Sequence, residues 1–336
     1  MSFTISLQPG GQHFAIRPDQ TILEAALDAG FVVPYGCRDG ACGACKAHID
    51  SGRIDQGAVS ADVLSAAERA AGTALLCQAR ALSDVTVTVR NVTRAGDVPV
   101  KKLPCRVQSL EFPAPDVAVL KVRLPASEPF RFRAGQYIDF LLEGGRRRSF
   151  SIANAPGGNE LELHIRRIAG GFFTNHVFTA MKPRDILRFE GPLGGFGLAP
   201  GDAPAVLIAG GTGFAPIKSI IEEHLAGGGK RALTLYWGSR DRAGLYMDAL
   251  AQEWARTVPG FRYVPVLSAA TPADRWTGRT GLVHHAVMAD LPDLSRHEVY
   301  ACGAPAMIEA ARADLVARCR LRPDAFFADA FTFASA

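Results

Sequence analysis

The sequence of 336 residues lacks a hydrophobic run long enough to cross a membrane. A membrane-spanning helix needs about 20 consecutive apolar residues. The most apolar stretch, residues 203–217, is shorter and is interrupted by glycine and proline. The N-terminus also lacks the basic start and apolar run of a secretory signal. We therefore expect a cytoplasmic protein that does not associate with membranes.

The sequence also lacks a basic tract. No run of Lys and Arg is long enough to follow a phosphate backbone, and the formal net charge is only +4, so we expect no nucleic-acid partner. Internal repeats and low-complexity segments are absent as well. The chain is 48% hydrophobic and 21% charged, which is ordinary globular composition. Its length predicts two or three domains.

Seven cysteines, an odd number in a chain expected in the cytoplasm, argue against structural disulfides. Four of them follow the spacing C-x4-C-x2-C and then, after 31 further residues, C: Cys37, Cys42, Cys45 and Cys77. This is the spacing of plant-type [2Fe–2S] ligands. Zinc sites prefer paired C-x2-C units, and only one such pair is present. The spacing therefore favours a [2Fe–2S] cluster on these four residues over zinc or free thiols.

Residues 1–92 predict a small α+β domain around this cysteine loop. Alternating strands are expected near residues 3–7 and 13–17, followed by a helix over 21–29. Another alternating strand is expected over 85–89. A ββα…β order interrupted by a cysteine-rich loop favours a β-grasp fold.

The rest of the chain predicts two further domains after a linker over residues 93–102. Residues 103–200 read almost entirely as strands punctuated by glycine and proline, which is typical of an antiparallel β-barrel. Residues 201–336 alternate apolar strands with helices, which predicts an α/β domain with a parallel sheet. A ligand of such a sheet would lie beyond the carboxyl ends of its strands.

Two motifs in the barrel segment suit a phosphate-bearing ligand. In Arg148–Ser151 an arginine can bind phosphate through charge-assisted hydrogen bonds, and the aromatic side chain can lie against a planar ring. Arginines at a strand end are also typical of a solvated face. Gly170 and Gly171 precede a helix expected from Thr174 to Met181, and this arrangement fits either an anion site or an ordinary helix cap.

A third motif, Gly210–Pro216, joins a buried strand to a helix in the last domain. Its glycines allow a pyrophosphate to approach the helix N-terminus closely. The motif is not the G-x-G-x-x-G fingerprint, and a glycine turn can also serve tight packing alone. The residues by themselves leave both interpretations open.

Together these motifs resemble known families. Residues 34–45 and 76–78 resemble plant-type ferredoxins, while Arg148–Ser151 and Gly210–Pro216 resemble the R-x-[YF]-S strand and the GGTGxxP turn of the ferredoxin–NADP reductase superfamily. The order of domains is similar to reductases of bacterial ring-hydroxylating oxygenase systems that begin with a ferredoxin. Within them it looks most like the CDP-6-deoxy-3,4-glucoseen reductase-like proteins.

The resemblance implies a [2Fe–2S] cluster, FAD rather than FMN, and NADH as electron donor, with NADPH possible through Arg240 and Arg242. It implies these flavin-binding residues: Arg148, Ser149, Phe150, Ser151, His164, Arg166, Gly171 and Thr174. It implies these nucleotide-binding residues: Gly211, Thr212, Gly213, Ser239, Arg240 and Cys302. Ser151, Cys302 and Phe331 are the expected catalytic residues, with Phe331 covering the flavin. Cys302 could equally be a small buried hydrophobic residue.

The function implied by the resemblance is electron transfer. A hydride passes from NADH to FAD, and single electrons then pass through the cluster to a partner protein, either an oxygenase component or a dehydrase carrying a CDP-6-deoxy-3,4-glucoseen-type intermediate. The alternatives are a flavin oxidoreductase with a structural cluster and a redox sensor. A monomer is expected, and the sequence does not identify the partner.

Overall fold

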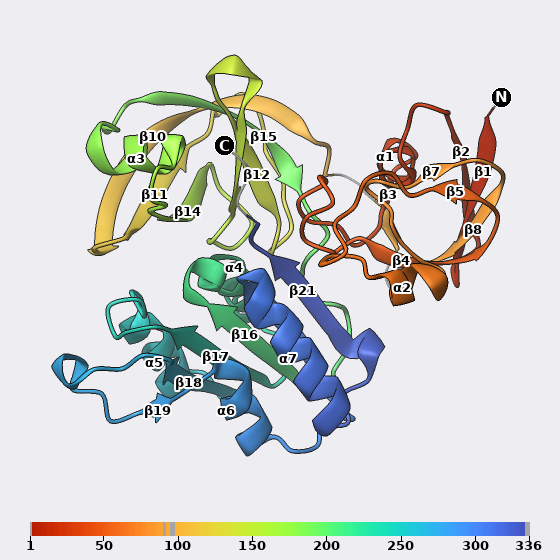
Figure 1. Ribbon diagram of the computed structural model, residues 1–336. Coiled ribbons are helices and arrows are strands. Elements are labelled where there is room, and N and C mark those ends of the chain that lie inside the picture. Colours follow the sequence, from red (N-terminus) through yellow and green to blue (C-terminus); the bar gives the residue numbers. More distant parts are fainter. Residues whose placement is uncertain (1, 90–91, 95–97, 333–336) are drawn as a thin grey trace. The chain divides into compact units, whose positions relative to one another are not determined.

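The computed structural model describes residues 2–89, 92–94 and 98–332, and the contacts divide the chain into two compact units (Figure 1). The first unit consists of the chain up to Pro99 together with two short later segments, Gly194–Phe196 and Asp329–Thr332. The second unit contains the remainder, from Val100 onward. Each unit is described separately below.

The first unit is built on a five-stranded sheet in the order β2-β1-β8-β4-β6. The strands are β1 (Phe3–Gln8), β2 (Gln12–Ile16), β4 (Lys46–Ser51), β6 (Thr73–Leu75) and β8 (Val85–Thr88). Strand β1 is antiparallel to β2 and parallel to β8, and β4 is antiparallel to both β8 and β6. Helix α1 (Ile22–Asp28) buries Ile22 and Leu23 in the core. The predicted α+β β-grasp is confirmed.

Helix α1 begins directly after Thr21, which caps its N-terminus. The Thr21 hydroxyl accepts a hydrogen bond from the Glu24 amide, and the Glu24 carboxylate accepts one from the Thr21 amide, which is a complete capping box. The shorter elements are α2 (Ala66–Ala70), β3 (Phe31–Val32) paired with β9 (Thr93–Arg94), and β5 (Ile54–Asp55) paired with β7 (Arg80–Ala81). Strand β9 therefore lies inside the segment that was expected to be a linker.

The first half of the second unit is a six-stranded antiparallel sheet in the order β13-β12-β15-β10-β11-β14. Its strands are β10 (Lys101–Ala114), β11 (Val117–Arg123), β12 (Tyr137–Leu141), β13 (Arg147–Ser151), β14 (Glu160–Arg166) and β15 (Ile186–Leu193). A bridge between Ile152 and Leu163 joins the two edges of the sheet and closes it into the predicted barrel. The short helix α3 (Phe172–Thr179) and the 3₁₀ turn η1 (Glu143–Gly145) complete this half.

The second half is a sheet in the order β19-β18-β17-β16-β20-β21, and the pairs from β19 to β20 are parallel. Its strands are β16 (Ala205–Gly210), β17 (Leu233–Ser239), β18 (Phe261–Leu267), β19 (Arg279–Thr280), β20 (Glu298–Gly303) and β21 (Phe326–Ala330). The strand order reverses between β16 and β20. Ligands of such sheets bind at this point, outside the carboxyl ends of the strands.

Four helices and three 3₁₀ turns complete the parallel-sheet half. They are α4 (Phe214–Ala226), α5 (Asp248–Thr257), α6 (Val283–Asp290), α7 (Pro305–Arg318), η2 (Gly211–Gly213), η3 (Pro272–Asp274) and η4 (Pro323–Ala325). Helices α6 and α7 pack side by side (Figure 1). The predicted α/β domain is confirmed.

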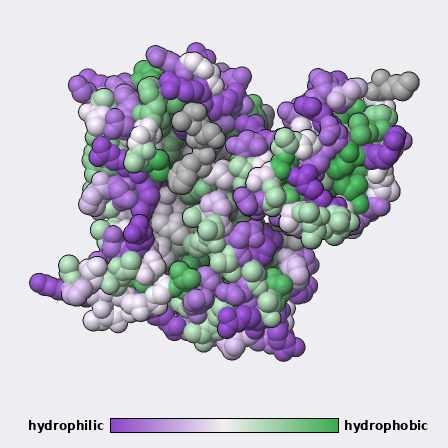
Figure 2. All heavy atoms as spheres, viewed as in Figure 1, coloured by the Kyte–Doolittle hydropathy of each residue, from purple (hydrophilic) through white to green (hydrophobic). Residues whose placement is uncertain are grey.

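The surface of the molecule is mainly hydrophilic on the face shown in Figure 2, where apolar residues gather only in small groups. None of the helices in the described residues combines the length and hydropathy that a bilayer crossing needs.

A buried polar network joins the barrel to the parallel sheet within the second unit. Lys218 of α4 is 5% exposed, and its ammonium lies 3.0 Å from the Glu162 carboxylate and 2.7 Å from Glu222. His164 Nε2 lies 2.9 Å from Glu162, and His164 Nδ1 lies 2.8 Å from the Tyr246 hydroxyl. Because every member has a partner, the network can be buried without leaving an unpaired charge.

Glu162 provides a test of this network. Burial raises the pKa of Glu162, but the hydrogen bond with His164 and the charge of Lys218 outweigh burial, and the pKa falls to about 2. The ionised carboxylate therefore stabilises the fold above the ordinary pKa of 4.5, and this contribution is lost as the pH falls toward 2. We expect Glu162→Gln to lower the free energy of unfolding at pH 7 by roughly 2–4 kcal/mol, measured by urea unfolding.

Glu253→Gln is the matched control, because Glu253 forms an exposed ion pair with Arg256 on the same unit. Exposed pairs contribute little, so this variant should unfold at nearly the wild-type urea concentration. Equal losses in the two variants would contradict the assignment of the stabilisation to the buried network.

Candidate functional site

The cysteine loop between β3 and β4 turns its backbone amides toward sulfur. The Cys37 amide donates to Cys42 Sγ at 3.4 Å, and the Cys42 amide donates to Cys37 Sγ at 3.3 Å. The Ala44 amide also donates to Cys42 Sγ, at 3.4 Å. Gly40 adopts a φ of +86°, which favours glycine and lets the loop double back on itself. Such donors stabilise negative charge on thiolate sulfurs.

The register of the sheet brings the third and fourth cysteines together. Strands β4 and β6 pair Lys46 with Leu75, so Cys45, one residue beyond this pair, and Cys77, two residues beyond it, lie at the same end of the sheet. The Leu76 amide donates to the Cys45 carbonyl at 3.2 Å, which continues the pairing toward Cys77. Two cysteines separated by 31 intervening residues thus become neighbours through an ordinary antiparallel register.

The four sulfurs form two pairs. Cys37 pairs with Cys42, and the hydrogen bond between their side chains raises the pKa of Cys37 and lowers the pKa of Cys42. Cys45 pairs with Cys77 in the same way, which raises the pKa of Cys45 and lowers the pKa of Cys77. In the described part of the chain, no three of these sulfurs lie within 4.8 Å of one another. One tetrahedral zinc ion, with Zn–S bonds of about 2.3 Å, would hold all four within roughly 4 Å. Two pairs suit two irons better.

A later segment of the chain reaches the same loop within the first unit. A Cβ atom on Gly36 would lie 3.1 Å from Cys42 Sγ and 3.3 Å from Asp329 Oδ1. Gly195 donates its amide to the Tyr35 carbonyl at 3.3 Å. Burial raises the pKa of Asp329 to about 7. Sequence reasoning gave Asp329 no role, although an acidic residue inside the apolar run 326–331 was a signal.

Phe331 also belongs to the first unit, where it is half-buried. The flavin-binding candidates lie in the second unit, so the expected contact between Phe331 and a flavin stays a prediction. The last aromatic residue of the same run, Phe333, lies outside the described residues.

Strand β13 of the second unit presents the barrel candidates on alternate faces. Arg148 and Phe150 are half-buried on one side, and Phe150 packs 5.4 Å from the Phe173 ring. Ser149 points the other way, where its hydroxyl donates to Asp139 at 2.6 Å. Ser151, at the end of the strand, is 8% exposed. The strand therefore places Arg148 and Phe150 on one face, and Ser151 on the other face together with Ser149.

Helix α3 begins at Phe172, two residues before the expected start, with Gly171 as its N-cap. A Cβ atom on Gly171 would lie 2.6 Å from the Thr174 hydroxyl, so this position requires glycine. The Thr174 hydroxyl accepts from the Ile168 amide at 3.2 Å and thereby fixes the loop in front of the helix. The first amides of a helix have no intrahelical acceptor, which makes this end suitable for an anion.

Arg166, at the end of β14, offers an unused donor. Its Nη1 pairs with Asp116 at 2.8 Å, whereas its Nη2 is buried and has no hydrogen-bond partner among the described residues. A Cβ atom on Gly211 would lie 3.4 Å from this Nη2, so the barrel arginine sits against the glycine turn of the parallel sheet. A buried guanidinium nitrogen without a partner fits an anionic ligand such as a pyrophosphate.

His164 is placed differently from the other candidates. Its side chain is fully enclosed, and both ring nitrogens are occupied by Glu162 and Tyr246. Burial lowers the pKa of His164, against the opposing effect of Glu162. Any contribution of His164 to ligand binding would therefore act through the position of β14.

The glycine turn after β16 packs directly on the end of β20. A Cβ atom on Gly213 would lie 2.1 Å from the Cys302 carbonyl oxygen, so only glycine fits there. Cys302 is fully buried, while Gly211 and Thr212 are half-buried. These residues meet at the point where the strand order reverses, as expected for a nucleotide site.

Two further features of this region concern neighbouring residues. Ser239 ends the adjacent strand β17, and Arg240 follows it as an exposed residue. Trp237 was missed by sequence reasoning. Its indole N–H donates to the Gly211 carbonyl at 3.0 Å, and its ring stacks on the Phe214 ring with centroids 3.9 Å apart. Both contacts hold the glycine turn in place.

Comparison with known domain families gives three matches along the chain. Residues 5–82 match the 2Fe-2S iron-sulfur cluster binding domain, and residues 104–197 match the oxidoreductase FAD-binding domain. Residues 207–313 match the oxidoreductase NAD-binding domain. The predicted cofactors, a [2Fe–2S] cluster, FAD and a nicotinamide dinucleotide, are thereby confirmed as the groups for which these domains are built.

Curated relatives cover nearly the whole chain. The CDP-6-deoxy-L-threo-D-glycero-4-hexulose-3-dehydrase reductase of Yersinia pseudotuberculosis is 43% identical over 98% of this chain and 99% of its own length. Reductase component 2 of terephthalate 1,2-dioxygenase from Comamonas is 36% identical over 93% of this chain and 92% of its own. The crystal structure of an Amycolatopsis cytochrome P450 reductase is 38% identical, with a TM-score of 0.78, and covers 99% of this chain and 100% of its own.

The close packing at Gly36 leads to a first test of the cysteine loop. We expect Gly36→Ala to push the new methyl group against Cys42 Sγ and the Asp329 carboxylate, and so to lower the iron and sulfide content of the purified protein. Metal analysis and visible absorption measure the loss. Gly10→Ala is the control, because the three atoms nearest to its Cβ would all belong to the flexible Gln12 side chain of the same unit. Full iron content in Gly36→Ala would contradict this geometry.

The unpaired Arg166 nitrogen leads to a second test. We expect Arg166→Gln to weaken FAD binding about 10- to 100-fold, the range for losing a hydrogen bond between charged groups. Titration of the flavin-free protein with FAD measures the change. Arg123→Gln is the control, because Arg123 is an exposed arginine of the same barrel whose guanidinium hydrogen-bonds to the Gln108 side chain. Unchanged affinity in Arg166→Gln would remove this residue from the site.

Proposed function

The chain belongs to the iron–sulfur flavoprotein reductases that join a 2Fe-2S domain to oxidoreductase FAD-binding and NAD-binding domains, and we propose on this premise that it delivers single electrons from NADH to a partner protein. When bound, the flavin and the cluster would supply the chemistry that separates one hydride into two single electrons and a proton. The chain's own residues supply binding, orientation and electrostatics.

The cysteine sulfurs carry this proposal. We propose that Cys37 and Cys42 hold one iron and that Cys45 and Cys77 hold the other. The two sulfur pairs support this assignment. The amide donors around Cys42 stabilise the negative charge that accumulates on the sulfurs.

In the second unit, we propose that Arg148, Arg166 and the start of α3 hold the FAD pyrophosphate, with Gly171 and Thr174 shaping that helix end. Charge-assisted hydrogen bonds from arginine and the helix amides provide the affinity. The unpaired Arg166 Nη2 supports this arrangement.

The hydride transfer step depends on how two planar rings are held. We propose that Phe150 flanks the isoalloxazine and that Ser151 hydrogen-bonds near its reactive nitrogen. Thr212 and Cys302 border the nicotinamide, with Gly211 and Gly213 admitting the phosphates. Enclosure by buried residues such as Cys302 excludes water from the reacting atoms. Ser239 and Arg240 lie at the strand end expected for the adenosine ribose.

We propose NADH rather than NADPH as the donor. A 2′-phosphate needs an arginine, and Arg240 and Arg242 were the two candidates. Arg242 is held by two hydrogen bonds to Asp274. The backbone amide of Arg242 donates to the Asp274 carboxylate at 3.0 Å, and its guanidinium donates to the Asp274 backbone carbonyl at 3.4 Å. A carboxylate beside this arginine disfavours a second anion there, and Arg240 alone remains for such a contact.

The acceptor follows from the relatives. We propose a soluble cytoplasmic partner, either an oxygenase component or, favoured by the 43% identity over nearly the full length, a dehydrase acting on a nucleotide-linked deoxysugar. We propose that the protein acts as a monomer, because a single chain carries all the candidate residues.

One experiment separates this proposal from a flavin oxidoreductase with a structural cluster and from a redox sensor. We expect Cys42→Ser to keep reduction of the flavin by NADH and to lose at least about 100-fold in NADH-dependent cytochrome c reduction, because one-electron transfer needs the cluster. Cys105→Ala, a buried cysteine of the barrel, is the control and should keep both activities.

The same assays test the donor. We expect kcat/KM for NADPH to be at least tenfold below that for NADH. Cytochrome c reduction that survives Cys42→Ser would indicate a structural cluster, and its absence in the wild-type protein would indicate a sensor.

A further inference from the structure

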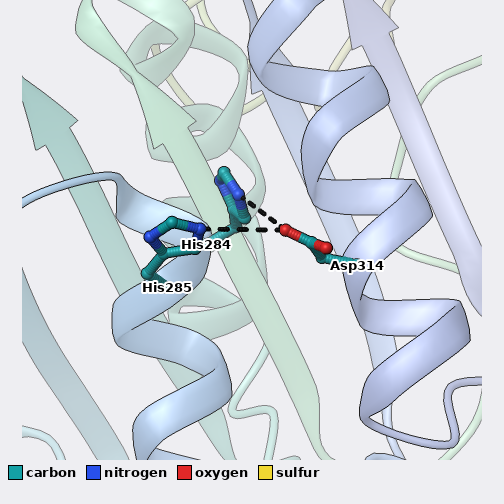
Figure 3. Close-up of side chains that lie close together, drawn as sticks. All are labelled: His284, His285 and Asp314. Atoms are coloured by element: carbon teal, nitrogen blue, oxygen red, sulfur yellow. Dashed lines mark ion pairs between the residues drawn. The ribbon is translucent and has the colours of Figure 1, made fainter.

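Helices α6 and α7 bring three potential metal ligands together on the parallel-sheet half of the second unit: His284, His285 and Asp314 (Figure 3). Asp314 Oδ2 lies 3.2 Å from His284 Nε2 and 3.8 Å from His285 Nε2. One ligand atom from each of the three residues falls within 4.8 Å of the others. Both imidazoles point toward the carboxylate from neighbouring positions of α6.

We propose that this cluster binds a divalent ion of the zinc class and links α6 to α7. Zinc takes imidazole nitrogen and carboxylate oxygen at about 2.0–2.2 Å in a tetrahedral arrangement, which separates neighbouring ligands by roughly 3.4 Å. The two measured nitrogen–oxygen distances lie on either side of this value. Two imidazoles with one carboxylate also favour zinc over magnesium or calcium, which prefer oxygen ligands alone.

The two histidine rings are close neighbours. Their centroids are 4.4 Å apart, and both rings present Nε2 to the same carboxylate oxygen of Asp314.

His284 is difficult to explain as a core residue alone. Its side chain is 3% exposed, and its Nδ1 is buried without a hydrogen-bond partner in the described structure. A buried polar atom without a partner destabilises the fold. A metal bond at Nε2 would leave Nδ1 unpaired, but it would give this buried ring a strong interaction that no apolar side chain in the same place could provide.

The remaining charged group at the cluster leaves the metal position open. Arg318, one turn along α7, lies 3.8 Å from Asp314 Oδ1, whereas both histidines face Oδ2. His285 is exposed and lines a hollow of about 430 Å³ at the surface. A water molecule from this side can complete a tetrahedral shell around a zinc ion held by three protein ligands.

Zinc binding to the intact holoprotein tests the proposal. We expect one zinc ion per chain by calorimetry and by metal analysis after dialysis, together with a zinc-dependent rise in Tm. Asp314→Asn and His285→Ala should each weaken binding at least tenfold and abolish the rise in Tm, because each removes one of three ligands. His285 is preferred to His284 for substitution, because it is exposed and its loss should leave the fold intact.

His176→Ala is the matched control, because His176 is an exposed histidine on α3 of the same unit and has no carboxylate ligand partner within its own helix turn. It should bind zinc as the wild-type protein does. The visible spectrum of the cluster is recorded throughout, so that zinc taken up by the cysteines in place of iron is detected. Absence of saturable binding, or binding unchanged in both His285→Ala and Asp314→Asn, would overturn the proposal.

Discussion

The first unit is organised around four cysteine sulfurs, three from the loop between β3 and β4 and the fourth from Cys77, which follows β6. Backbone amides stabilise negative charge on these sulfurs. The amides of Cys37, Cys42 and Ala44 all turn inward, and the conformation that allows this depends on glycine. The sheet serves the same end, because the pairing of β4 with β6 carries Cys45 and Cys77 to one place. The β-grasp is therefore a means of holding two sulfur pairs at a fixed separation.

The second unit follows a different rule, which is close approach of backbone to backbone. At Gly213 the turn after β16 comes so near the Cys302 carbonyl that no side chain fits, and Trp237 supports the turn with a hydrogen bond to Gly211. The buried group of Lys218, Glu162 and His164 then fixes the barrel against the sheet. The positions of the candidate cofactor-binding residues thus depend on contacts between segments far apart in the sequence.

This difference explains what the sequence could predict. The cysteine spacing, the strand alternation and the glycine turns are local patterns, and the three domain types inferred from them are confirmed. The role of Glu162 as the partner of Lys218 was not foreseeable, because the two residues are separated by more than fifty positions and neither belongs to a motif. The start of α3 at Phe172 and the strand β9 within the expected linker likewise arise from packing. Local propensity sets neither of them.

The two short segments that return to the first unit have a consequence for modularity. Ferredoxin-like domains are attractive parts for gene fusion, and residues 1–99 look like a self-contained part when only the chain order is considered. Yet Gly195 covers the carbonyl of Tyr35, and Asp329 closes over Gly36 beside the cysteine loop. An excised domain would present both positions to solvent. The first unit is thus made of three separate segments of the chain, and a fusion protein that contains only residues 1–99 would lack two of them.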